Sequence, residues 1–173
     1  MDRAEVLLTT AEIAIAFAGF GGLAGLLGRH RTRDDVRIDV MRLRAILEGS
    51  LMVAGAAALP LVLSSYSEGS DSIWRVASGL FLLASLMLVG LWTKRIRAVV
   101  AAGVALDRRI VGMFYLIAVV MTGLLGLNLL NVSPGRLFPR YVSALYTQLF
   151  GMAILFLRLV ASLVATAGHD ETS

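Results

Sequence analysis

"AEIAIAFAGFGGLAGLLG", residues 11–28, is an apolar run that contains one carboxylate, Glu12, and five glycines. With the apolar residues before it, the run reaches the length of about 20 residues that an α-helix needs to cross roughly 30 Å of hydrocarbon. It is apolar all round, whereas the strands of a membrane barrel alternate apolar and polar residues. The run therefore predicts a transmembrane helix.

The composition extends this prediction to the whole chain. Its 173 residues are 58% hydrophobic and 16% charged, with a mean hydropathy of +0.81, which lies outside the range of an ordinary soluble domain. Backbone polar groups cannot stay unpaired in lipid, so we predict a single domain of the all-α class, a polytopic transmembrane helical bundle. The predicted spans are residues 7–28, 46–66, 73–93, 110–132 and 141–167. Arg158 interrupts the fifth span, which leaves four spans as the alternative.

The charged segments predict how the chain lies in the membrane. Residues 29–45 hold six arginines, and residues 94–109 hold one lysine and four arginines, whereas residues 67–72 hold no basic residue. The positive-inside rule then places the N-terminus outside and the C-terminus in the cytoplasm. We expect both basic segments to be helical extensions that contact anionic lipids of the inner leaflet. This interpretation accounts for the net charge of +4 without a nucleic-acid partner.

The first predicted helix has two distinct faces when its residues are placed about 100° apart. One face is acidic, then small, then apolar, and consists of Glu5, Thr9, Glu12, Ala16, Gly19, Leu23 and Leu26. The opposite face carries small residues that allow a neighbouring helix to approach closely, namely Ala14, Ala18, Gly21, Gly22 and Gly25. The sequence thus predicts one packing face and one face of unknown environment.

Polar residues inside the spans are costly in lipid and are expected to face protein or water. Their predicted depths pair Glu12 with Arg75, or with the amides of Asn128 and Asn131. The same reasoning pairs Glu48 with Arg158 nearer the cytoplasm. Such pairs would hold helices together.

Two accounts of the first helix remain open. In one, several copies of the chain form a homo-oligomeric ion channel, with Glu5 and Glu12 attracting cations and Leu23 and Leu26 forming a hydrophobic constriction. The order of residues is similar to that in the pore helix of calcium-release-activated calcium channels, although the orientation is opposite. In the other, Glu12 is buried within its own bundle, and the protein is an accessory subunit or a small carrier.

Other chemistry has little support in the sequence. The chain has no cysteine and no grouping of serine, histidine and carboxylate typical of catalysis, so we expect neither an enzyme nor a cofactor or metal site. Residues 8–28, "LTTAEIAIAFAGFGGLAGLLG", followed by "MRLRAILEGSL" at 41–51, resemble the start of short bacterial multi-pass membrane proteins without an established activity. This resemblance implies a location in the bacterial inner membrane.

Overall fold

The computed structural model describes residues 2–27, 33–66, 71–103, 107–132 and 135–170. They form the five helices α1 (Arg3–Leu27), α2 (Arg33–Ser64), α3 (Asp71–Ala101), α4 (Arg108–Leu129) and α5 (Leu137–Asp170). Each helix is long and apolar enough to cross a bilayer, including α5 with its Arg158. The predicted all-α fold with five candidate spans is therefore confirmed for the described residues, and these spans indicate a multi-pass membrane protein.

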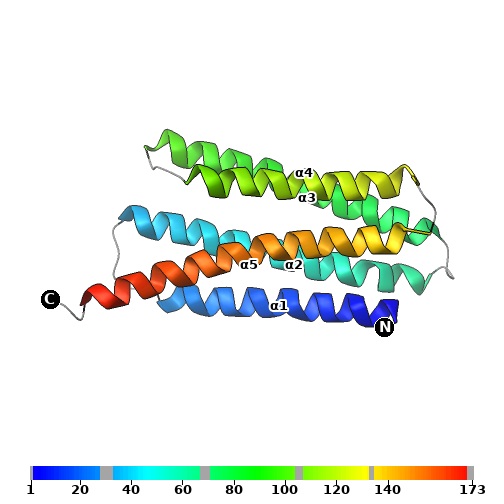
Figure 1. Cartoon of the computed structure of the whole chain (residues 1–173), viewed down its shortest axis with the longest axis horizontal. Helices are drawn as coiled ribbons and strands as arrows, with labels where there is room; N and C mark the ends of the chain where they lie inside the picture. The colour runs from blue at the N-terminus through cyan, green and yellow to red at the C-terminus, as the bar shows by residue number, and fades with distance from the viewer. Residues whose placement is uncertain (1, 28–32, 67–70, 104–106, 133–134, 171–173) are drawn as a thin grey trace.

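The helices form a bundle with α2 and α5 in the middle, as Figure 1 shows. On one side α1 packs against α2 and α5, and in the described part of the chain it contacts neither α3 nor α4. On the other side α3 and α4 form a pair that also packs against α5. Helix α1 therefore lies at the edge of the bundle, and α5 joins its two halves.

The basic segments continue the membrane helices. The arginine-rich stretch from Arg33 onward is the first part of α2, and Lys94, Arg95 and Arg97 lie on the last turns of α3. Val40, in the basic first part of α2, is 57% exposed. Ala45 and Ile46 are buried at this end of α2, with the partly buried Met41 beside them.

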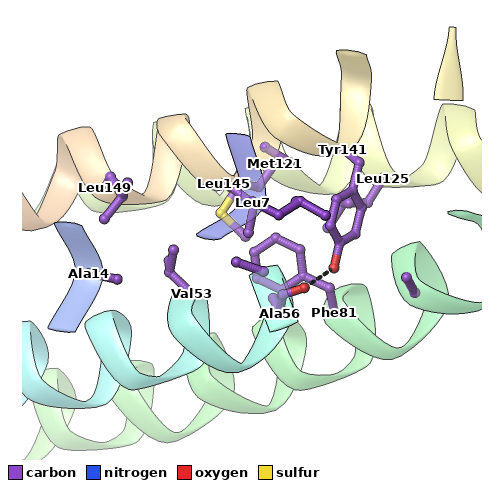
Figure 2. Packing of buried hydrophobic residues seen from close by; sticks show 13 residues of the cluster. Leu7, Ala14, Val53, Ala56, Phe81, Met121, Leu125, Tyr141, Leu145 and Leu149 are labelled. Atoms are coloured by element: carbon purple, nitrogen blue, oxygen red, sulfur yellow. Dashed lines mark hydrogen bonds between the residues drawn. The ribbon is translucent and has the colours of Figure 1, made fainter. Parts of the chain in front are cut away.

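The larger core cluster joins all five helices around Tyr141, and Figure 2 shows most of its members. The Tyr141 ring is fully buried and makes edge-to-face contacts with Phe81 and Trp74 at centroid distances of 5.9 Å. A smaller cluster around Trp92, Met152 and Leu155 fills the other end of the bundle. Because lipid tails are as apolar as these side chains, close packing and hydrogen bonds contribute most to helix association.

A hydrogen bond from Tyr141 compensates for the proline in α2. Pro60 has no N–H, so the carbonyl of Ala56 lacks its usual partner within the helix. The Tyr141 hydroxyl donates to that carbonyl oxygen at 2.6 Å, as Figure 2 shows. A side chain of α5 thus satisfies the backbone group that the proline leaves free.

Helices α2 and α5 approach each other most closely at Gly49. A Cβ atom on Gly49 would lie 2.9 Å from Met152 Cε and 3.2 Å from Gln148 Nε2, which is too close for both contacts to persist. On the other side of α5, a Cβ atom on Gly151 would lie 2.8 Å from Ile117 Cδ1 of α4. These glycines therefore allow side chains of the neighbouring helices to reach the backbone.

We expect Gly49→Ala to leave the protein about 1 kcal/mol less stable than Gly55→Ala, because displacing the Met152 side chain offsets the better helix propensity of alanine. Gly55→Ala is the matched control on the same helix, because a Cβ atom there has no neighbour within 4 Å. Thermal unfolding of both variants in detergent measures the difference. Equal melting temperatures for the two variants would contradict this close approach.

Candidate functional site

The face of α1 that carries Glu12 points away from the rest of the chain. Glu5, Glu12, Ala16, Gly19 and Leu23 are exposed and Thr9 is half-buried, and we call these six residues the Glu12 face. The backbone of Leu26 continues α1, but its side chain lies outside the described part. The opposite side of the helix, with Leu7, Thr10 and Ala14, is buried. The expectation that Glu12 is buried within its own bundle is therefore wrong, because α1 occupies the edge.

Glu12 lies inside the apolar part of α1, which runs from Arg3 to Leu27 and is a candidate membrane span. Its neighbour Ala14 belongs to the same buried cluster as Val53 of α2 and Leu149 of α5 (Figure 2). Within the described residues, no hydrogen bond or ion pair engages the Glu12 carboxylate. An ionisable group at this depth, on an uncovered face, is costly unless water or another protein meets it.

The predicted partners of Glu12 lie on or just after other helices that do not bring them to it. Arg75 is on α3, which α1 does not contact, and its guanidinium Nη2 donates to the carbonyl of Leu129 at 3.5 Å. Asn131 follows the end of α4 in a left-handed conformation, with φ of 52°. The predicted Glu12–Arg75 pair is therefore wrong, because residues at similar depths lie on opposite sides of the bundle.

Asn128 is fully buried and connects three helices instead of meeting Glu12. Its side-chain nitrogen donates to Ser78 Oγ of α3 at 3.1 Å and to the Leu137 carbonyl of α5 at 2.9 Å. The second bond ties Asn128 to the backbone of the first residue of α5. Asn128 thus holds α3, α4 and α5 together, away from α1.

Glu48 pairs with arginines other than the one expected. Its Oε2 accepts a hydrogen bond from Arg95 of α3 at 2.7 Å, and its Oε1 accepts one from Arg44 at 2.7 Å. Arg95 also lies over the Trp92 ring, 5.1 Å from its centroid. Arg158 instead lies 3.8 Å from Asp107 Oδ2. The predicted Glu48–Arg158 pair is wrong because α3 continues past residue 93 and brings Arg95 to α2.

The small-residue face of α1 meets α2 at two of its positions. Ala14 and Gly21 are buried, and a Cβ atom on Gly21 would lie 3.0 Å from Ile46 Cγ2. Ala18 is half-buried, as is Gly22, which has open space at its Cβ position. The backbone of Gly25 is helical, but its surroundings lie outside the described part. Gly19, on the other face, also has open space, so no contact within the chain requires a glycine there.

Two neighbouring cavities lie between α2, α3, α4 and α5, and the sequence did not predict them. The inner one has a volume of about 40 Å³ and is lined by residues that include Met52, Met113, Met121, Met152 and Gln148. The outer one, about 210 Å³, extends toward the basic end of the bundle and shares three lining residues with the inner one, Ile110, Phe114 and Leu155. The only available signal in the sequence was the positions of the methionines, and methionines at such positions also occur in ordinary cores.

Comparison with known proteins gives no further assignment. No protein-family model, curated protein or solved structure matches the chain. The resemblance to short bacterial membrane proteins and the orientation of the termini therefore stay predictions. The five apolar helices and the exposed Glu12 face are the features from which a function can be inferred.

Proposed function

We propose that this chain forms a homo-oligomeric cation channel in which the Glu12 faces of several copies surround a central axis. The observation that carries the proposal is the exposed Glu12 carboxylate inside a candidate membrane span, on a face that no other described helix covers. The bacterial inner membrane, with the basic end in the cytoplasm against anionic lipids, is the setting we infer from the charge distribution.

The energetics of the carboxylate favour a water-filled axis over lipid. A charged side chain at the centre of a membrane helix costs about 2.5–3.5 kcal/mol on insertion scales. Around an axis the same carboxylates are hydrated, and a ring of them raises the local concentration of cations. The uncovered face of each α1 thereby becomes a functional surface instead of an energetic liability.

The other residues of the Glu12 face suit the same arrangement. Ala16 and Gly19 have short side chains or none, so helices can approach the axis without closing it. Leu23 is 60% exposed and follows them along the helix, where a ring of leucines would form a hydrophobic constriction. The face thus combines an element that attracts cations with one that can restrict their passage.

Cation flux into liposomes tests the proposal directly. Glu12→Gln removes the charge at nearly the same volume, and we expect it to lower potassium flux about tenfold or more, because the cation-concentrating ring is lost. Glu12→Asp keeps the charge and is the matched control, with flux close to that of the unmodified chain. The proposal fails if Glu12→Gln conducts like Glu12→Asp, or if the unmodified chain shows no flux above empty liposomes.

A further inference from the structure

We infer that the inner cavity is a binding site for a soft monovalent cation of the Cu(I) or Ag(I) class. We call it the methionine cavity, and its thioethers come from Met52 of α2, Met113 and Met121 of α4, and Met152 of α5. The site contains no residue of α1, so it is independent of the Glu12 face.

A polar side chain without a partner in the described part of the chain lines this cavity. Gln148 is only 7% exposed and lines the cavity, yet no hydrogen bond connects its side chain to any residue in the described ranges. Burying an amide without a partner costs about 1–3 kcal/mol, so buried amides in folded proteins are nearly always satisfied. A group that enters the cavity would supply the missing partner.

Two facing helical turns bring the donor atoms together. Gly49 and Met52 lie three residues apart on α2, and Gln148 and Met152 lie four residues apart on α5, so each pair occupies one helix face. The close approach at Gly49 places Met152 and the Gln148 amide beside this turn of α2. Met52 Sδ lies 4.0 Å from Ser85 Oγ of α3. Thioether, amide and hydroxyl groups from three helices therefore line the same cavity.

The chemistry of these donors selects the ligand. Thioether sulfur is a soft, neutral ligand that favours Cu(I), whereas calcium and magnesium require several oxygen ligands and zinc favours thiolate or imidazole. No group of three or more His, Cys, Asp or Glu residues suited to a metal occurs in the described part. The volume of about 40 Å³ exceeds the roughly 10–15 Å³ that one water requires, so a single ion fits.

The outer cavity lies beside this site. It shares Ile110, Phe114 and Leu155 with the methionine cavity and is lined toward the basic end by Met41 and Asp107. Five of the seven methionines of the chain thus line the two cavities, which is more than scattered core packing requires. Met87, in contrast, is 63% exposed on α3 and lines neither cavity.

Binding of Ag(I), a probe that does not change oxidation state, tests the inference on the purified full chain. We expect native mass spectrometry to detect one Ag(I) per chain, and Met152→Leu to weaken its retention about tenfold or more, as loss of a metal-site residue does. Met87→Leu is the matched control and should bind like the unmodified chain. Leucine has nearly the same volume as methionine, so both variants are expected to fold.

Three outcomes would overturn the inference. These are no Ag(I) retained by the unmodified chain, equal retention by Met87→Leu and Met152→Leu, or a copurified organic molecule in the cavity that Ag(I) does not displace. Should Met152→Leu lower the melting temperature, Met113→Leu provides the same comparison at a half-buried position. Glu12→Gln should bind Ag(I) normally, so failure of the channel proposal and failure of this site are distinguishable.

Discussion

Tyr141→Phe is expected to lower the free energy of unfolding by about 2 kcal/mol, because it leaves a buried carbonyl without a donor. The Tyr141 hydroxyl donates to the Ala56 carbonyl at 2.6 Å, and the tyrosine is fully buried. Water cannot replace the lost donor in this apolar cluster without a further rearrangement. Thermal or denaturant unfolding in detergent micelles measures the loss. Tyr146→Phe on the same helix is the matched control, because Tyr146 is 45% exposed and has no hydrogen bond in the described part.

A second substitution tests the cause. Pro60→Ala restores a backbone N–H that can bond to the Ala56 carbonyl within α2. In the Pro60→Ala background, Tyr141→Phe should therefore cost much less than it does in the unmodified chain. A strictly additive double variant would show that the hydroxyl and the proline act independently, and would contradict the proposed compensation.

The number and type of helices were predictable because the bilayer imposes a minimum length on each apolar run. The helix ends were less predictable, since a helix can continue beyond the hydrocarbon where water satisfies its charged side chains. The predicted second span starts at residue 46, whereas α2 begins at Arg33, inside the basic segment expected to extend it. The extension expected to reach residue 109 ends, as part of α3, at Ala101. Hydropathy identifies the apolar part of a helix, but it does not give the residue at which a charged helical extension begins or ends.

The pairing of polar residues failed for a geometric reason. Hydropathy and the direction of the chain give the depth of a residue, but they do not give its position around the bundle. Glu12 and Arg75 were paired by depth alone, although α1 and α3 make no contact in the described residues. The two faces of α1 were predictable because they depend only on helix periodicity. Which of them faces outward depends on the position of α1 in the bundle, which the sequence does not determine.

The internal cavity could not be predicted from residue types. Met52, Met113 and Met152 look like ordinary core residues in the sequence, because methionine commonly fills irregular gaps. Gln148 looks like a polar residue on the face of a helix next to Thr147. Only the packing of α2 and α5 at Gly49 places the thioethers and the amide around one space. The function of such a site depends on contacts between helices that are distant in sequence.

Ala16→Cys is expected to convert most of the protein into covalent dimers when membranes are mildly oxidised. The chain contains no cysteine, so a single introduced thiol has no competing partner. Ala16 is exposed on the Glu12 face, one helical turn beyond Glu12, and a homo-oligomer around this face would bring copies of residue 16 together. Disulfides form when the two Cα atoms come within about 7 Å, which the short side chains of this face permit.

Met87→Cys is the matched control for this experiment, because Met87 is 63% exposed on α3, at a position remote from α1. We expect it to stay monomeric under the same oxidation, since random collisions in the membrane are its only route to a dimer. Equal cross-linking of both variants would mean that collision explains the Ala16→Cys dimer. If neither variant cross-links and Gly19→Cys also stays monomeric, the Glu12 faces of different copies do not lie next to each other. The accessory-subunit or carrier account would then replace the channel. Strong cross-linking without cation flux would support the homo-oligomer and contradict the channel activity. The cross-linking and flux experiments together therefore test the assembly and the channel separately.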